Sequence, residues 1–186
     1  MADDFKLIVF TAPTLFNGEA DIINSLFGSA MQLLHLRKPN VSYKQMQCLI
    51  MQIPPEFHPN IVLHSHYKLA DKFNLKGIHL TEKTRHLYPQ LSKKNARIVS
   101  TSCHSIAELV QVKASYEYVF LSPIFNSISK QNYNAAFSKA ELYRAVSKGY
   151  IDSKVIALGG IDESNIQFVR NIGFGGAAVL GRIWEE

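Results

Sequence analysis

Two apolar runs near the C-terminus end in glycines, and glycines at such a place are typical of anion sites. The run 155–158 precedes Gly159 and Gly160, and the run 176–180 ends with Leu180 before Gly181. Glycine has no Cβ, so an anion can approach the backbone N–H groups closely enough to accept their hydrogen bonds. We therefore expect a phosphate group to bind beside Gly159, Gly160, Leu180 and Gly181.

Four of the seven histidines, His35, His64, His79 and His104, lie within two residues of a predicted strand end. Histidine can give and take a proton near neutral pH. His104 opens a predicted helix whose N-terminal dipole favours the neutral imidazole, so we expect it to be the acid–base catalyst. A histidine at a helix start that only faces solvent is the alternative. His79, between two apolar residues, fits a histidine hydrogen-bonded within the sheet, and His35 and His64 are candidate substrate contacts.

Further polar residues at predicted strand ends complete the candidate site. Arg37 follows a buried strand, and a buried guanidinium needs a carboxylate or phosphate partner. A structural salt bridge is the alternative for Arg37. Ser102 ends the fifth run and is a candidate substrate contact. Ser127, Ser129 and Lys130 alternate along a loop, where they would bind phosphate oxygens, although an ordinary polar turn has the same pattern.

The elements that must position these residues are eight short runs rich in β-branched and aromatic residues. They are 7–11, 31–37, 61–64, 77–80, 97–102, 118–122, 154–157 and 176–180. Segments of helical period lie between most of them, with capping boxes predicted at Ser42 and Ser105. A further helix begins at Asp162 or Ser164 and ends at Gly173.

Strands that alternate with helices favour a parallel sheet, and eight such units favour closure into a (β/α)₈ TIM barrel. An open doubly wound sheet is the alternative. The chain has 186 residues, which is short for a barrel, so we predict a truncated α/β barrel with its eighth helix short or absent. No linker or charge block divides the sequence, and residues 1–186 are predicted to be a single domain.

The charge, the hydropathy and the cysteine content of the chain restrict the classes of function that it can have. The formal net charge is +5, which suits an anionic small molecule, but no basic stripe interleaved with aromatic residues indicates nucleic-acid binding. No apolar run reaches the length of a membrane span, and we expect no membrane partner. Two isolated cysteines and the absence of a signal segment at residues 1–6 predict a cytoplasmic protein. The sequence is compatible with a homo-oligomer.

Motifs along most of the chain resemble the thiamine phosphate synthase and thiazole tautomerase superfamily. The similar stretches are 34–38 (Leu-His-Leu-Arg-Lys), 76–80, 102–105, 119–130 (ending Asn-Ser-Ile-Ser-Lys), 157–165 (with Gly-Gly-Ile) and 176–180. The sixth-strand motif and the Gly-Gly-Ile motif are specific when they occur in this order. The resemblance implies a barrel that binds a thiazole ethyl phosphate through the glycine turns and the loop hydroxyls.

The synthase branch holds Mg²⁺ with two aspartates, and the resemblance places them at Ser65 and, across a loop, Thr84. Neither position is acidic here. A diphosphate leaving group needs its charge neutralised, so their absence disfavours the synthase. The resemblance also implies a basic stretch on the second strand, and this chain departs from it. His35 stands where the family usually has glutamine, and Pro39 stands where it usually has a second basic residue. Gly181 stands where a serine is common.

The tautomerase branch uses a histidine and no metal, and His104 matches that histidine. We therefore predict a thiazole tautomerase, an isomerase with His104 as acid–base, Arg37 on the substrate carboxylate, and no metal or cofactor. Thiamine phosphate synthase is the main alternative, with Glu82 as a candidate Mg²⁺ ligand. A zinc or iron hydrolase built on His64 and His66 is a third hypothesis, and a non-catalytic regulator that binds thiazole phosphate is a fourth.

Overall fold

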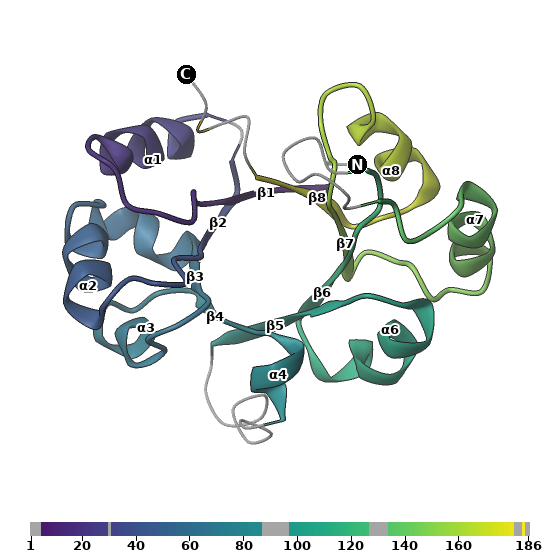
Figure 1. Ribbon diagram of the computed structural model, residues 1–186, viewed down its shortest axis with the longest axis horizontal. Helices are drawn as coiled ribbons and strands as arrows, with labels where there is room; N and C mark the ends of the chain where they lie inside the picture. Colours follow the sequence, from purple (N-terminus) through teal and green to yellow (C-terminus); the bar gives the residue numbers. More distant parts are fainter. Residues whose placement is uncertain (1–4, 30, 87–96, 127–133, 181–183, 185–186) are drawn as a thin grey trace.

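The computed structural model describes residues 5–29, 31–86, 97–126, 134–180 and 184. Eight parallel strands form a closed barrel in chain order, as the sequence predicted (Figure 1). The strands are β1 (Lys6–Phe10), β2 (Leu33–Leu36), β3 (Ile61–Leu63), β4 (Gly77–Leu80), β5 (Ile98–Cys103), β6 (Tyr118–Leu121), β7 (Val155–Leu158) and β8 (Gly176–Val179). β8 pairs with β1, with Ile8 opposite Ala178, and this pairing closes the ring.

Helices surround the barrel on the outside (Figure 1). They are α1 (Glu19–Phe27), α2 (Tyr43–Met51), α3 (Lys68–Lys72), α4 (Glu82–Arg85), α6 (Ile106–Val112), α7 (Lys139–Ser147) and α8 (Ile166–Ile172), with 3₁₀ turns at Pro55–Asn60 and Lys113–Ser115. Of the described residues after β8, Leu180 and Trp184 are not helical, which agrees with the prediction of a truncated barrel. Trp184 Nε1 donates to the carbonyl of Phe10 at 2.8 Å.

Successive residues of each strand point alternately into the barrel and out toward the helices. On β2, Leu34 and Leu36 pack outward in the cluster under α1 and α2, while Leu33 packs inside the barrel. His35 lies between the two outward residues and therefore points inward. The barrel interior is filled by Ile8, Phe10, Leu33, Val62, Tyr118, Phe120, Ile156 and Ala178. Polar side chains thus share the barrel interior with a mostly apolar packing layer.

Local signals fix most helix ends. Ser42 forms the predicted capping box with Gln45, and Gly173 ends α8 in the left-handed region at φ 107°. Ser105 caps α6, but the Glu108 carboxylate accepts from the N–H of His104 rather than from that of Ser105, so the predicted box is incomplete. Among the described residues, the helices are too short or too polar to cross a membrane.

Candidate active site at the C-terminal end of the barrel

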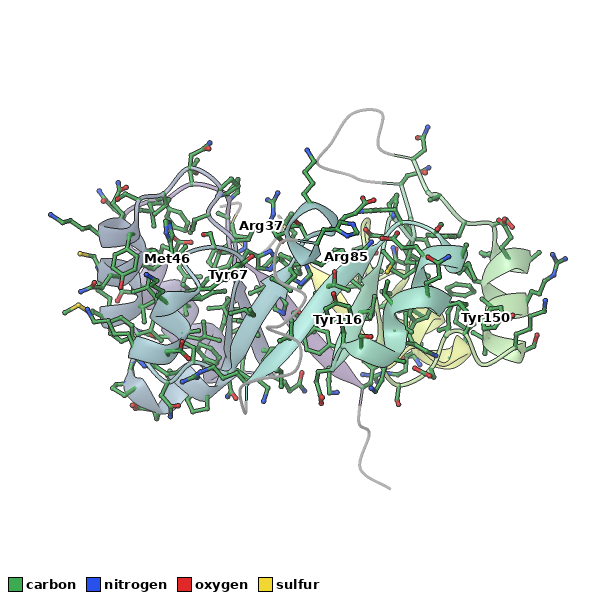
Figure 2. All side chains as sticks on the ribbon, turned by 90° about the horizontal axis from the view of Figure 1, so that it is seen from below. Arg37, Met46, Tyr67, Arg85, Tyr116 and Tyr150 are labelled. Atoms are coloured by element: carbon green, nitrogen blue, oxygen red, sulfur yellow. The ribbon has the colours of Figure 1, made fainter. Side chains whose placement is uncertain are left out.

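The C-terminal ends of parallel strands meet at one end of a barrel, where barrel enzymes place their active sites. Figure 2 shows Arg37, which follows β2, and Arg85 of α4 at this same end. The described candidate residues fall into two groups here. One group lies on β2, β3, β4 and β5 and uses side chains, and the other follows β6 and β7 and uses the backbone.

Three histidines from consecutive strands meet inside the barrel, and we call His35, His64 and His79 the histidine wall. His35 Nδ1 lies 2.8 Å from His64 Nε2. The rings of His64 and His79 stack with their centroids 4.2 Å apart. One ring nitrogen of each histidine lies within 4.8 Å of the other two. The sequence placed His35 and His64 in the site, and the structure joins them to His79, which was predicted to be a buried hydrogen-bonded residue.

Hydrogen bonds hold the outer nitrogens of the histidine wall. His35 Nε2 lies 2.6 Å from the Tyr118 hydroxyl, and His79 Nδ1 lies 2.9 Å from Ser100 Oγ. His79 Nε2 lies 3.1 Å from Ser102 Oγ, so the predicted substrate-binding residue Ser102 lies beside this group. These contacts fix the ring planes, and they come from the inward positions of β5 and β6.

The histidine wall is desolvated, and its rings are neutral at neutral pH for that reason. His35 is fully buried, and His79 is 2% exposed. Burial lowers the pKa of His35 and His64 well below the ordinary value, and it lowers the pKa of His79 to about 3. The charge of Arg37 lowers the pKa values of His64 and His79 further.

Arg37 and Lys38 have different environments although they are neighbours. Lys38 is fully buried, pairs with Glu19 of α1 and donates to the Thr14 carbonyl at 2.8 Å. Burial lowers the pKa of Lys38 and raises that of Glu19, and their mutual hydrogen bond opposes both shifts. Arg37 is half-buried, and no carboxylate pairs with it among the residues the structure describes. Of the two cations, Arg37 is therefore the one placed to meet an anion.

The second group is the turn after β7, and we call Gly159 and Gly160 the glycine end. Both have left-handed backbones, with φ 96° and φ 64°. A Cβ on Gly159 would lie 2.9 Å from Pro123, and one on Gly160 would lie 2.3 Å from the carbonyl oxygen of Asn126. Only glycine fits here, because two loop backbones touch and the dihedral angles exclude other side chains.

At the glycine end, the backbone carbonyls accept hydrogen bonds from neighbouring residues, and the backbone N–H groups are the donors that matter for an anion. The carbonyl of Gly159 accepts from the N–H of Phe125 at 3.0 Å, and that of Gly160 accepts from Asn165 Nδ2 at 2.8 Å. Within the described ranges, no backbone acceptor is paired with the N–H of Gly159 or Gly160. Two adjacent backbone N–H groups with positive φ are the kind of concave donor site that binds anions.

The neighbouring strand brings Leu180 to the same end. Leu158 of β7 pairs with Ala178 of β8, so Gly160 and Leu180 each follow that pair by two residues. Leu180 is 38% exposed, as a residue at the rim should be. The other predicted phosphate ligands, Ser127, Ser129, Lys130 and Gly181, lie outside the described residues, so their part in the site stays a prediction.

His104 lies at the start of α6 and is exposed. Its Nδ1 donates to the Ser122 carbonyl at 3.0 Å, and its backbone N–H donates to Glu108 at 2.8 Å. Burial alone would raise the pKa of Glu108, but the hydrogen bonds from His104 and Arg85 hold it below the ordinary value. With Nδ1 occupied, His104 presents Nε2 as its hydrogen-bonding atom at the rim.

The residues at the predicted Mg²⁺ positions do not fit that ion. Ser65 Oγ is buried with no partner among the described residues, and the backbone N–H of Thr84 donates to the side chain of Thr81, which caps α4. Neutral hydroxyls do not replace the carboxylates that Mg²⁺ prefers. Glu82, the carboxylate considered in their place, is exposed on α4.

The hydrolase hypothesis built on His64 and His66 is wrong for a geometric reason. His66 has a left-handed backbone at φ 53°, and its Nε2 donates to the Val41 carbonyl at 2.7 Å. Its ring packs against Tyr43 of α2, and among the described residues the potential metal ligands grouped with His64 are His35 and His79, not His66. The partner of His64 is instead His35, on the neighbouring strand.

Sequence reasoning missed two features of the site. It did not find the buried pair of Lys38 and Glu19, because the two residues lie far apart in sequence on different elements. It also treated His79 separately from His35, although alternation already placed both on the inward side of their strands. Pairing β2 with β3 and β3 with β4 would have brought the inward histidines together.

The fold and the glycine end define a (β/α)₈ barrel with a glycine turn after its seventh strand, where many such barrels bind phosphate. Comparison with known proteins gives the family. The thiamine monophosphate synthase family matches residues 7–183, and this chain belongs to that family.

Individual relatives agree with the family. A crystal structure named thiamine phosphate pyrophosphorylase, from Bacteroides thetaiotaomicron, is 43% identical, covers 97% of this chain and 85% of its own, and superposes with a TM-score of 0.84. The thiamine-phosphate synthase of Clostridium novyi is 22% identical over 97% of this chain and 91% of its own length. A thiamine phosphate pyrophosphorylase from Pyrococcus furiosus is 20% identical over 95% of this chain and 86% of its own, and its TM-score of 0.69 supports the fold.

These comparisons correct the predicted activity. The relatives are named as synthases, which are transferases, and nothing in the comparisons singles out the tautomerase branch. The prediction of a thiazole tautomerase, an isomerase with His104 moving a ring proton, is therefore wrong. It gave too much weight to two absent aspartates and to one histidine that the structure leaves at the exposed rim.

Proposed function

We propose that this chain is a thiamine-phosphate synthase, a transferase that joins a pyrimidine methyl diphosphate to a thiazole ethyl phosphate and releases diphosphate. The observation that carries the proposal is the 43% identity, over 97% of this chain, to a barrel named thiamine phosphate pyrophosphorylase. The N–H groups at the glycine end support it, because they suit the phosphate of the thiazole half.

The two groups of residues divide the substrates between them in this proposal. The thiazole phosphate binds at Gly159, Gly160 and Leu180, where backbone N–H groups neutralise its charge without a side-chain cation. Arg37 faces the diphosphate, because it is the half-buried cation beside the histidine wall and a guanidinium can bind two phosphate oxygens at once. His104 offers Nε2 to the bound substrate at the rim.

The pyrimidine then lies against the histidine wall. Neutral imidazoles can both donate to and accept from a heteroaromatic ring, and His64 is the member of the wall that is partly exposed. The surrounding rings of Phe10 and Phe120 exclude water from that side. Such a pocket holds the pyrimidine methyl group toward the thiazole, and the reaction gains from this positioning.

The test is direct synthesis by the purified chain. The full chain is incubated with both substrates, and chromatography measures the products. Thiamine phosphate and diphosphate are expected to form in equal amounts. Arg37→Gln should lower kcat/KM by about 10- to 100-fold, since a hydrogen bond to a charged group contributes about 1.5–3 kcal/mol. Arg144→Gln, at an exposed arginine of α7, is the matched control and should leave the rate unchanged.

A folded protein that binds thiazole phosphate but makes no thiamine phosphate would contradict the proposal. That outcome is what a non-catalytic thiazole-phosphate regulator predicts.

A further inference from the structure

We propose that His35, His64 and His79 form a binding site for one divalent transition-metal ion of the zinc type, with the fourth coordination position open. The proposal does not depend on the synthase function, because it concerns metal binding in the absence of any substrate. It differs from the family's Mg²⁺ site in both the donor atoms and the positions used.

The donor set decides which metal fits. Three imidazole nitrogens suit Zn²⁺, Co²⁺, Ni²⁺ and Cu²⁺, whereas Mg²⁺ requires oxygen ligands. Three protein nitrogens with one open position are the coordination of catalytic zinc sites. Within the part of the chain that the structure describes, His35, His64 and His79 are the one such group of potential ligands.

The distances allow an ion to enter with small side-chain movements. Zinc–nitrogen bonds of about 2.0–2.1 Å in a tetrahedral site place the nitrogens about 3.3 Å apart. His35 Nδ1 and His64 Nε2 are 2.8 Å apart, and the ligand atoms of all three rings lie within 4.8 Å of one another. The first pair must therefore open by about half an ångström while the third ring moves closer.

The outer hydrogen bonds match those that metal-bound histidines make. A histidine ligand usually donates its other ring N–H to an oxygen, which fixes the ring orientation. His35 Nε2 already lies 2.6 Å from the Tyr118 hydroxyl, and His79 Nδ1 lies 2.9 Å from Ser100 Oγ. Because the other ring nitrogen of His79, Nε2, lies 3.1 Å from Ser102 Oγ, one of the two serine contacts of His79 gives way when the ion binds.

Metal binding shifts protons within the chain without a net loss. In the metal-free site, the proton between His35 and His64 resides on one of the two facing nitrogens. When the ion binds, the histidine that carried this proton changes tautomer, so the proton moves to the outer ring nitrogen, Nε2 of His35 or Nδ1 of His64. His35 then carries a proton on Nε2 and donates it to Tyr118. The Tyr118 hydroxyl then turns its own proton toward Ser100, to which it also bonds.

The surroundings suit a shielded ion with one open position. Aromatic rings enclose the cluster, with the Phe10 and Phe120 centroids 4.9 and 5.0 Å from that of His35. His64 is the partly exposed member, so the ion enters from the C-terminal end of the barrel. Arg37 lies at that end (Figure 2) and repels a bare cation, so it favours an anion as the fourth ligand.

The test is a titration of the full chain, with any affinity tag removed and all metal stripped by a chelator, with Co²⁺ and then Zn²⁺. We expect one Co²⁺ per chain with the intense visible absorption of tetrahedral cobalt, and displacement of that ion by Zn²⁺. His35→Gln introduces the residue that the resemblance gives as usual at this position, and His64→Asn keeps a polar side chain. Both variants should fold, as circular dichroism will check. Each should weaken Zn²⁺ binding at least about 100-fold, as loss of even a supporting contact costs up to that factor.

His66→Gln is the matched control, because His66 follows the same strand but bonds to Val41, and it should bind as tightly as the wild type. X-ray absorption of the zinc-loaded wild type should show three imidazole ligands, and this measurement needs no variant. Absence of saturable binding, binding that survives His35→Gln and His64→Asn, or fewer than three imidazoles on the ion would each overturn the proposal. The first outcome would mean that the cluster is a hydrogen-bonded network only.

Discussion

The histidine wall and the glycine end occupy the same end of one barrel, but the first is built from side chains and the second from backbone groups. The histidine wall places titratable side chains inside the barrel, where they depend on one another and on Tyr118, Ser100 and Ser102. The glycine end uses backbone N–H groups, and its shape depends on two residues that lack side chains.

This difference explains which half of the site resembles the family. A backbone site tolerates changes in most nearby side chains but no change at its glycines, so it keeps a recognisable sequence. A side-chain site can be rebuilt one residue at a time, and here histidines and hydroxyls stand where the resemblance places glutamine and carboxylates. The barrel can therefore retain its phosphate site while its opposite wall acquires a different donor set.

The largest effect is expected at the glycine end. Gly160→Val should abolish binding of inorganic phosphate and of thiazole phosphate, because its Cβ would lie 2.3 Å from the Asn126 carbonyl and force the two loops apart. Isothermal titration calorimetry measures the binding, and circular dichroism checks that the barrel remains folded.

Gly149→Ala is the matched control for Gly160→Val. Gly149 also has a positive φ, of 69°, but a Cβ there would meet nothing within 4 Å. The control should lose about 1–2 kcal/mol of stability from the left-handed backbone and keep full phosphate affinity. Equal binding by Gly160→Val and the wild type would remove the glycine end from the site.

A smaller but still large effect is expected at the buried pair of Glu19 and Lys38, of which Lys38 follows the strand of His35. Lys38→Met should lower the free energy of unfolding by about 3–5 kcal/mol at neutral pH, since it leaves Glu19 charged and unpaired in the interior. Burial already raises the pKa of Glu19, so the loss should shrink as the pH falls and the carboxyl becomes protonated. Urea unfolding at several pH values measures both effects, and a loss that is the same at every pH would contradict this explanation.

Acid should destabilise the metal-free protein through the histidine wall. The folded pKa values lie below the unfolded value of about 6.5, so the unfolded chain binds more protons as the pH drops. Stability is then complete above about pH 6.5 and falls below it, by up to about 1.4 kcal/mol per pH unit for each histidine. Urea unfolding between pH 7.5 and 4.5 should show this slope.

Replacing two of the three histidines, with His35→Gln and His64→Asn together, should reduce that slope by about two thirds. Gly149→Ala, outside the wall, should leave it unchanged. A slope that the double variant does not alter would assign the acid sensitivity to other groups.

The sequence was sufficient for the barrel because each strand carries its own signal. The eight apolar runs match the eight strands within a few residues at each end, and the glycines at 159 and 160 are visible as a motif. These features are local, since they depend on alternation and on residues that only glycine can replace.

The composition of the histidine wall could not be read in the same way, because it depends on contacts across strands. His35, His64 and His79 are separated by 29 and 15 positions in the chain, and only the parallel pairing of β2, β3 and β4 brings them together. The same limit applied to Lys38 and Glu19. Activity was misjudged because single residues were weighed against a family pattern before their neighbours in space were known.

The central claim is that the phosphate of the thiazole half is bound by the backbone of the glycine end and not by the histidine wall. A titration of the ¹⁵N-labelled chain with inorganic phosphate, followed by nuclear magnetic resonance, tests it directly. The largest saturable shifts are predicted at the amide N–H groups of Gly159, Gly160 and Leu180, with those of His35 and His79 nearly unmoved. Saturable shifts centred on the histidine wall, with the glycine amides unaffected, would contradict the account.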